Sequence, residues 1–241
     1  MRWAVACVAA AFCALANSGW TAEPWEIEPL EWAKFTEPTA RYPHAVLGDE
    51  IEYGALVLKY IPGHAKYTIR LPRDRVFEDI KPRLVDIDQD GKREAMVVES
   101  HKAKGARLAL YNGGGLIAAT PYIGTRFRWL APLGAADLDD DGHMEVAYID
   151  RPHLAKTLRV WRFKNGTLTE IATLPGLTNH KIGWNYIPGG IRTCGETHEM
   201  ILANANWSRV MAVSLTDDAL QAQDIGPYRG SESLDAALSC P

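Results

Sequence analysis

The chain has 241 residues, of which 47% are hydrophobic and 23% are charged, and its formal net charge is −4. This composition is typical of a globular protein with enough chain to bury the core of one medium-sized domain. The mildly negative balance gives no electrostatic basis for binding nucleic acid or an anionic membrane, and we therefore expect neither as a partner.

The first 22 residues differ in character from the rest of the chain. A positive charge at Arg2 is followed by an apolar run from residue 5 to residue 16 and then by small residues. This order predicts a secretory signal peptide over residues 1–22, cleaved between residues 18 and 22, and a single domain over residues 23–241. A retained membrane anchor is the alternative, although the apolar run is short for a bilayer span. We expect a periplasmic or extracellular protein, with no membrane span once the signal is removed.

Removal of the signal peptide would leave two cysteines. Cys7 and Cys13 would leave with it, and Cys194 and Cys240 would remain. In an oxidising compartment two cysteines favour one disulfide, and two free thiols are the alternative. Neither residue belongs to a CxxC pair, so we expect no redox or zinc role.

After residues 23–41, which are expected to pack on the rim or to complete a blade, the chain contains an imperfect repeat. An acidic motif over residues 86–94, Asp-Ile-Asp-Gln-Asp-Gly-Lys-Arg-Glu, recurs over residues 137–145 as Asp-Leu-Asp-Asp-Asp-Gly-His-Met-Glu. Each copy leads into a short all-apolar run, which is typical of a strand buried on both faces. Weaker copies follow Pro43 and Pro188. The repeat units are therefore expected near residues 43–75, 82–121, 132–176 and 188–226.

Within these units, predicted strands are joined by turn sequences. Asn165-Gly166 is a strong signal for a type I′ hairpin turn. Helical periodicity of useful length is missing from the mature sequence. The strand pairs are expected at residues 107–111 and 116–120, 157–163 and 168–173, and 210–215 and 220–224. With about four antiparallel strands per unit, the chain is predicted to be all-β, a small β-propeller of about four blades; a partial or five-bladed propeller and a β-sandwich are the alternatives.

The two acidic motifs have the chemistry of calcium loops. Calcium takes six to eight oxygen ligands, and carboxylates at positions one, three and five of a tight loop can converge on one centre. The glycine at position six allows the positive φ that reverses the chain. A backbone carbonyl at position seven and the acid at position nine would complete the shell. The predicted ligand residues are Asp86, Asp88, Asp90, Lys92 and Glu94 in one loop and Asp137, Asp139, Asp141, His143 and Glu145 in the other.

Two other kinds of structure contain motifs like these. An EF-hand needs a glutamate at position twelve, where this chain has Val97 or Tyr148 within an apparent strand, so that interpretation fails. Acidic surface turns that bind no metal are the remaining alternative.

Residues 84–98 and 135–149 resemble the FG-GAP or VCBS repeat of integrin α-subunit propellers and of many bacterial exported proteins. The resemblance is specific over these two units and weak over the other two. It implies that each loop joins the first and second strands of a blade, and that the two Ca²⁺ ions are structural rather than catalytic. In a weaker copy Cys194 takes the place of the third aspartate. We therefore hypothesise that a Cys194–Cys240 disulfide replaces a calcium staple in that blade.

No catalytic signature is found: the sequence has no GxSxG, HExxH, GxxxxGK or GxGxxG motif in a suitable context. In a propeller, the segments entering each blade lie on the face opposite the calcium loops, and here they are rich in aromatic and charged residues. This face is the predicted ligand site, with the candidates Tyr42, His44, Phe77, Glu78, Arg126, Arg128, Trp129, His180, Lys181 and Trp184. The alternative is that the aromatic residues pack between blades and the charges are merely solvated.

The sequence therefore favours an exported, calcium-stabilised binding or scaffolding protein without catalytic activity, whose ligand is a protein or a glycan. One alternative is a metal-assisted hydrolase or lyase, which is disfavoured because both metal loops look fully coordinated. Another is a structural subunit whose partial propeller is completed by a partner chain.

Overall fold

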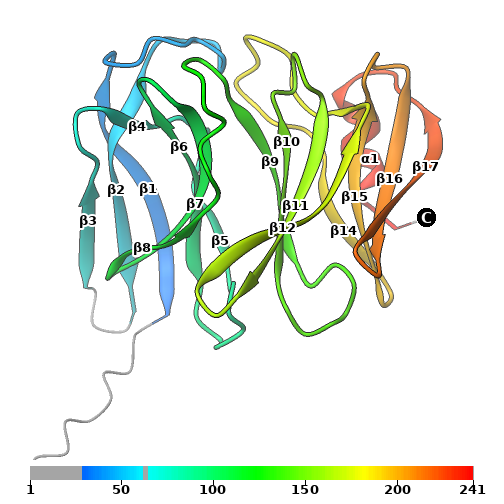
Figure 1. Ribbon diagram of the computed structural model, residues 1–241, viewed down its shortest axis with the longest axis horizontal. Coiled ribbons are helices and arrows are strands. Elements are labelled where there is room, and N and C mark those ends of the chain that lie inside the picture. Colours follow the sequence, from blue (N-terminus) through cyan, green and yellow to red (C-terminus); the bar gives the residue numbers. More distant parts are fainter. Residues whose placement is uncertain (1–28, 62–64, 241) are drawn as a thin grey trace, which may run out of the picture.

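The computed structural model describes residues 29–61 and 65–240, and its three antiparallel sheets follow one another along the long axis of the molecule (Figure 1). The predicted signal peptide lies outside the described residues. Within the described part, seventeen strands and one short helix are present. None of the helices in that part is both long and apolar enough to cross a membrane.

The first sheet has eight strands that fall into two groups. The first group has β2 (Glu52–Tyr60) between β1 (Leu30–Thr39) and β3 (Lys66–Arg70). Tyr53 of β2 pairs with Phe77 of β4, which joins the two groups. The second group comprises β4 (Arg75–Phe77), β5 (Arg83–Val85), β6 (Glu94–His101), β7 (Gly105–Asn112) and β8 (Gly115–Ala119).

The other two sheets each form one group. The second sheet contains β9 (Leu130–Ala136), β10 (Glu145–Asp150), β11 (Thr157–Lys164) and β12 (Thr167–Pro175), which pair in that order. The third contains β13 (Leu177–Thr178), β14 (Gly190–Cys194), β15 (Thr197–Asn204), β16 (Arg209–Thr216) and β17 (Ala219–Pro227). In this sheet β13 and β14 both pair with β15, just as β4 and β5 both pair with β6. A seven-residue helix, α1 (Ser231–Ala237), follows β17.

The core lies between neighbouring groups, because the central strands are apolar on both faces. The runs that follow the acidic motifs form β6 and β10, and every residue of β10 is buried. Val98 of β6 and Tyr148 of β10 belong to one buried cluster, whereas Ile149 of β10 packs with Met200 of β15 in another. Each strand thus joins two layers of the core. The prediction of an all-β, propeller-like fold is confirmed.

The first group departs from the four-strand expectation, since it has three strands. Residues 40–51, which link β1 to β2, form turns and irregular structure rather than a strand. The backbone of this segment bonds to a distant connection instead, with Gly183 N donating to Val46 O at 3.0 Å. Part of the segment predicted to pack on the rim or complete a blade forms β1, which pairs with β2.

Candidate metal centres and the opposite loop face

The first loop (residues 86–94) links β5 to β6, and the second loop (residues 137–145) links β9 to β10; both lie at the lower edge of the molecule in Figure 1. Their backbones match closely. The fourth residues, Gln89 and Asp140, have φ values of 59° and 57°, and the glycines Gly91 and Gly142 both have φ of 85°. Left-handed backbone at the sixth position explains the glycine there. The sequence repeat is therefore also a conformational repeat.

In the first loop, carboxylate oxygens of Asp86, Asp88 and Asp90 lie within 4.8 Å of one another. Backbone groups orient the acids, since Gly91 N donates to Asp86 Oδ2 at 3.0 Å and Ile87 N donates to Glu94 Oε2 at 3.1 Å. Asp86 Oδ1 is buried and has no hydrogen-bond partner among the described residues. Converging hard oxygens with a free buried lone pair fit a calcium ion.

The charge of the first loop is not balanced by a neighbouring cation in the described part of the chain. Burial, together with the nearby carboxylates Asp88, Asp90 and Asp86, raises the pKa of Glu94 to about 7. Like charges this close disfavour ionisation unless a positive charge joins them. A divalent cation would supply that charge.

The second loop also brings three acids together, at positions one, three and nine rather than one, three and five. Oxygens of Asp137, Asp139 and Glu145 lie within 4.8 Å of one another. Gly142 N donates to Asp137 Oδ2 and Leu138 N donates to Glu145 Oε2, both at 2.9 Å. Asp139 Oδ1 is buried and lacks a hydrogen-bond partner in the described structure. The donor set again fits calcium.

The second loop differs from the first because a guanidinium reaches into it. Arg162 of β11 pairs in register with Glu145, and its Nε lies 2.6 Å from Glu145 Oε1. Its other nitrogens lie 2.7 Å from Asp139 Oδ2 and 3.3 Å from Asp141 Oδ2. In the first loop the residue equivalent to Arg162 is neutral. Ala95 of β6 pairs with Tyr111 of β7, and continuing this register by one residue places Asn112 opposite Glu94. Arg162 is recognised as a neighbour of the second loop only from the pairing of β10 with β11, because the nine-residue motif itself does not contain it.

At the seventh position of each loop, Lys92 and His143 donate their backbone N–H groups to Asp90 and Asp141, both at 2.8 Å. Their carbonyls remain predicted ligands. All ten predicted ligand residues therefore lie in the two loops, and three acids of each loop are close enough to share one ion.

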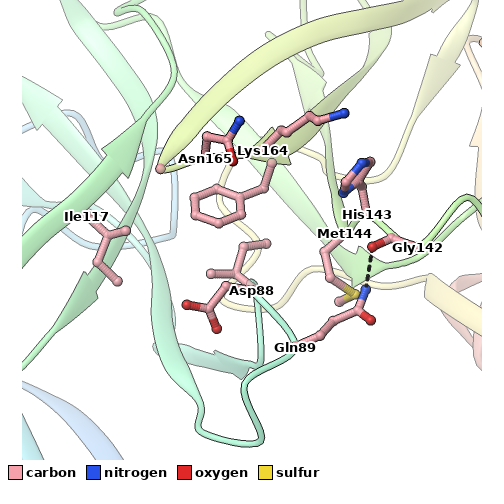
Figure 2. A pocket seen from close by; sticks show the side chains of 11 residues that line it. Asp88, Gln89, Ile117, Gly142, His143, Met144, Lys164 and Asn165 are labelled. Atoms are coloured by element: carbon pink, nitrogen blue, oxygen red, sulfur yellow. Dashed lines mark hydrogen bonds between the residues drawn. The ribbon is translucent and has the colours of Figure 1, made fainter. Parts of the chain in front are cut away.

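A cavity of about 420 Å³ separates the two loops (Figure 2). Gln89 of the first loop bridges it, with Nε2 donating to Gly142 O of the second loop at 3.4 Å. Apolar and polar side chains mix in its lining, which includes Ile117, Phe163 and Lys164. This hydrogen bond places the two loops in contact.

The third sheet carries a covalent link at the corresponding edge. Cys194 ends β14, just before the turn into β15, and it forms a disulfide with Cys240. The Cα atoms are 5.6 Å apart. This link ties the segment after α1 to the sheet, and it is the disulfide that the cysteine count predicted.

The connections between strands at the edge opposite the metal loops form a surface that we call the loop face. Five of the ten candidates on it are buried: Tyr42, Phe77, Glu78, Trp129 and His180. These buried side chains lie beneath the exposed residues of the loop face and pack against them or against the core. Trp129 Nε1, for example, donates to the Glu78 carbonyl at 2.9 Å, and the Glu78 carboxylate binds His44 Nδ1 at 2.5 Å. The accessible candidates are His44, Arg126, Arg128, Lys181 and Trp184.

A histidine pair that sequence reasoning missed fixes one of these connections. His153 Nε2 lies 3.1 Å from His180 Nδ1, and His180 Nε2 lies 2.9 Å from the Trp184 carbonyl. Burial lowers the pKa of each imidazole to about 4. With both rings neutral, His180 donates from Nε2 to the carbonyl and accepts at Nδ1 from His153.

Comparison with known families gives one match. Residues 86–148 match the model of an FG-GAP-like repeat, and this range runs from the first acid of the first loop to the strand after the second. No curated protein matches the chain.

Proposed function

The chain is an FG-GAP repeat-containing protein, and from this premise we propose that it is an exported, calcium-stabilised binding or scaffolding protein. The FG-GAP repeat supports a propeller-like domain of the binding or scaffold type. Calcium, export and the absence of catalysis are the further parts of the proposal, and the first two have support of their own.

The observation that carries the calcium assignment is one buried carboxylate oxygen in each loop without a hydrogen-bond partner among the described residues, at position one of the first loop and position three of the second. Asp86 Oδ1 and Asp139 Oδ1 are both buried without a hydrogen-bond partner among the described residues, each beside two further acids. A buried polar atom without a partner costs free energy, and a bound cation would remove that cost. Each ion would link the strand before its loop, β5 or β9, to the strand after it, β6 or β10, which is a structural role.

Export is supported by two features far apart in the sequence. The pattern of residues 1–22 predicts a signal peptide. The Cys194–Cys240 disulfide fits the same location, because disulfides persist in oxidising compartments. We place the protein in the periplasm or outside the cell.

The ligand would be a protein or a glycan bound on the loop face. The metal loops occupy the opposite edge, and their acids would be taken up by the structural ions. Arg128 and Trp184 contribute side chains of the kind that dominate binding hot spots. These residues come from connections of different groups, so the fold gathers them on one surface.

Calorimetry of the mature protein in excess calcium and in chelator tests the calcium assignment. At a calcium concentration about 100 times the dissociation constant, each site would add roughly 2.7 kcal/mol to the free energy of unfolding. Asp86→Asn should reduce the calcium-dependent rise in Tm. Asp140→Asn, at the exposed fourth position of the second loop, is the matched control and should leave it unchanged. Equal Tm values in calcium and in chelator would refute the proposal.

A further inference from the structure

The side chain of Lys181 ends among three aromatic rings of the loop face. Its Nζ lies 4.6 Å from the ring centroid of Trp207, 5.2 Å from that of Trp184 and 5.7 Å from that of Tyr228. All three distances are within the range of a cation–π interaction. The rings come from the β13–β14 connection, the β15–β16 connection and the segment after β17. Trp207 and Tyr228 were not anticipated from the sequence.

We call Trp184, Trp207 and Tyr228 the aromatic cage, because the rings also contact each other. The centroids of Trp184 and Trp207 are 5.4 Å apart, and those of Trp207 and Tyr228 are 5.1 Å apart. Tyr186 stacks on Trp184, with the ring centroids 4.7 Å apart. The cage therefore offers several ring faces to one cation.

Hydrogen bonds that do not involve the Lys181 side chain fix the backbone of the cage. His180 Nε2 donates to the Trp184 carbonyl at 2.9 Å, Trp207 N donates to Asn204 O at 2.9 Å, and Tyr228 N donates to Ser208 O at 3.0 Å. The rings can stay in place when the lysine side chain moves away. A preformed site of this kind loses little conformational entropy on binding.

Trp207 is also held in an unfavourable backbone conformation. Its φ is 60°, in the left-handed region that a bulky side chain rarely adopts. Asn204 maintains the turn, since its Oδ1 accepts from Ser208 N at 2.9 Å and from Arg209 N at 3.1 Å. Strained residues cluster at binding sites. The structure thus bears a conformational cost to present this ring.

The ammonium group of Lys181 is a poor chemical match for the aromatic cage. Lys181 is exposed, and none of the ion pairs formed by the described residues involves it. A primary ammonium carries three N–H donors, which ring faces satisfy poorly compared with water. A quaternary ammonium has no N–H to satisfy and is a better partner for ring faces.

We propose that the aromatic cage binds a small quaternary ammonium compound, with Lys181 as an internal occupant that the ligand displaces. This inference goes beyond the proposed function, because it assigns a small cationic ligand to one part of the loop face. The positive head group would sit where the lysine Nζ now lies. The methyl groups of the ligand would contact the rings of Trp184, Trp207 and Tyr228.

Titration of the mature protein with choline, followed by tryptophan fluorescence, tests the proposal. We expect a saturable response in the wild type and binding about tenfold tighter in Lys181→Ala, which removes the competing cation. Trp207→Ala should abolish the response. Trp32→Ala is the matched control, since Trp32 is a single ring with one lysine, Lys66, 5.9 Å from its centroid. It should leave choline binding unchanged.

A neutral isostere and a stability measurement complete the test. 3,3-Dimethyl-1-butanol has the shape of choline without the charge and should give no response. The proposal is wrong if Lys181→Ala does not bind choline, or if it binds the neutral alcohol equally well. The Lys181 substitution is at the surface, so folding does not obscure this result. The calcium dependence of Tm, measured on the same samples, shows separately whether the proposed function fails.

Discussion

The Nε atom of Arg162 lies 2.6 Å from Oε1 of Glu145, the last acid of the second loop. The same guanidinium contacts Asp139 and Asp141, which are also predicted calcium ligands, and Asp218 at 2.9 Å. A fixed cation inside a calcium site competes with the ion for the same oxygens. It also relieves the repulsion between the acids when calcium is absent. The two loops are therefore alike in backbone and unlike in charge.

We predict that the first loop binds calcium more tightly than the second, and that Arg162→Gln reduces the difference. Removing one positive charge leaves the carboxylates free for the ion, so calcium affinity at the second loop should rise about tenfold or more. In chelator the same variant should have a lower Tm than the wild type, because the acids lose their partner. Isothermal titration calorimetry measures the first effect and differential scanning calorimetry the second.

Arg159→Gln is the matched control for Arg162. Arg159 lies on the same strand and pairs with Asp150 and Glu170 away from the loops. It should alter Tm equally in calcium and in chelator. If Arg162→Gln left both calcium affinity and chelator stability unchanged, the guanidinium would have no role at the second loop.

The disulfide should stabilise the third sheet independently of calcium. It links Cys194 to Cys240 across 46 residues, and closing a loop of that size restricts the unfolded chain. The double variant Cys194→Ser, Cys240→Ser should lose about 2–5 kcal/mol of unfolding free energy in urea. A reductant should lower the stability of the wild type and leave the double variant unaffected. Equal urea midpoints for the two proteins without reductant would show that the link contributes nothing.

Acid should destabilise the loop face through the histidine pair. The pKa values of His153 and His180 are lowered to about 4 in the fold, from about 6.5 in an unfolded chain. Below pH 6.5 the unfolded state therefore binds more protons. The stability from the neutral pair is fully present above pH 6.5 and is lost as pH falls toward 4. Protonating His180 at Nδ1 would also set its N–H against that of His153, only 3.1 Å away.

His180→Gln provides the test of this pH dependence. Urea unfolding between pH 8 and pH 4, in chelator so that calcium binding does not contribute, should show a shallower loss of stability in the variant. The difference across the range should be roughly 2–3 kcal/mol. Parallel curves for His180→Gln and the wild type would contradict the assignment.

The features that could be predicted from the sequence are those determined by short segments of the chain. The two acidic loops, the buried strands after them and the Asn165-Gly166 turn depend on neighbouring residues, and each lies where it was expected. Arg162 could not be found this way, because its place in the second loop depends on the β10–β11 register. The aromatic cage likewise gathers residues from three connections, and their proximity exists only after the strands have paired.

Aromatic residues of the loop face show a second limit. Phe77 and Trp129 lie in segments that enter a blade, as do the accessible Arg126 and Arg128. Large apolar side chains bury first when a neighbouring group offers a surface, so Phe77 and Trp129 joined the core. Composition alone does not separate a residue on a binding face from one beneath it.

The connection that carries Lys181 and Trp184 depends on one glycine. Gly189 has φ of 81°, and a Cβ built on it would lie 2.2 Å from the carbonyl oxygen of Ile201 in β15. Gly189→Ala should therefore force the connection away from the sheet, lower Tm strongly and weaken choline binding. Gly195→Ala is the matched control, since Gly195 has φ of 68° and an added Cβ would meet nothing within 4 Å. It should cost only about 1 kcal/mol, the price of a positive φ for a residue with a Cβ. If both variants unfolded at the same temperature, contact with β15 would not be what positions this connection.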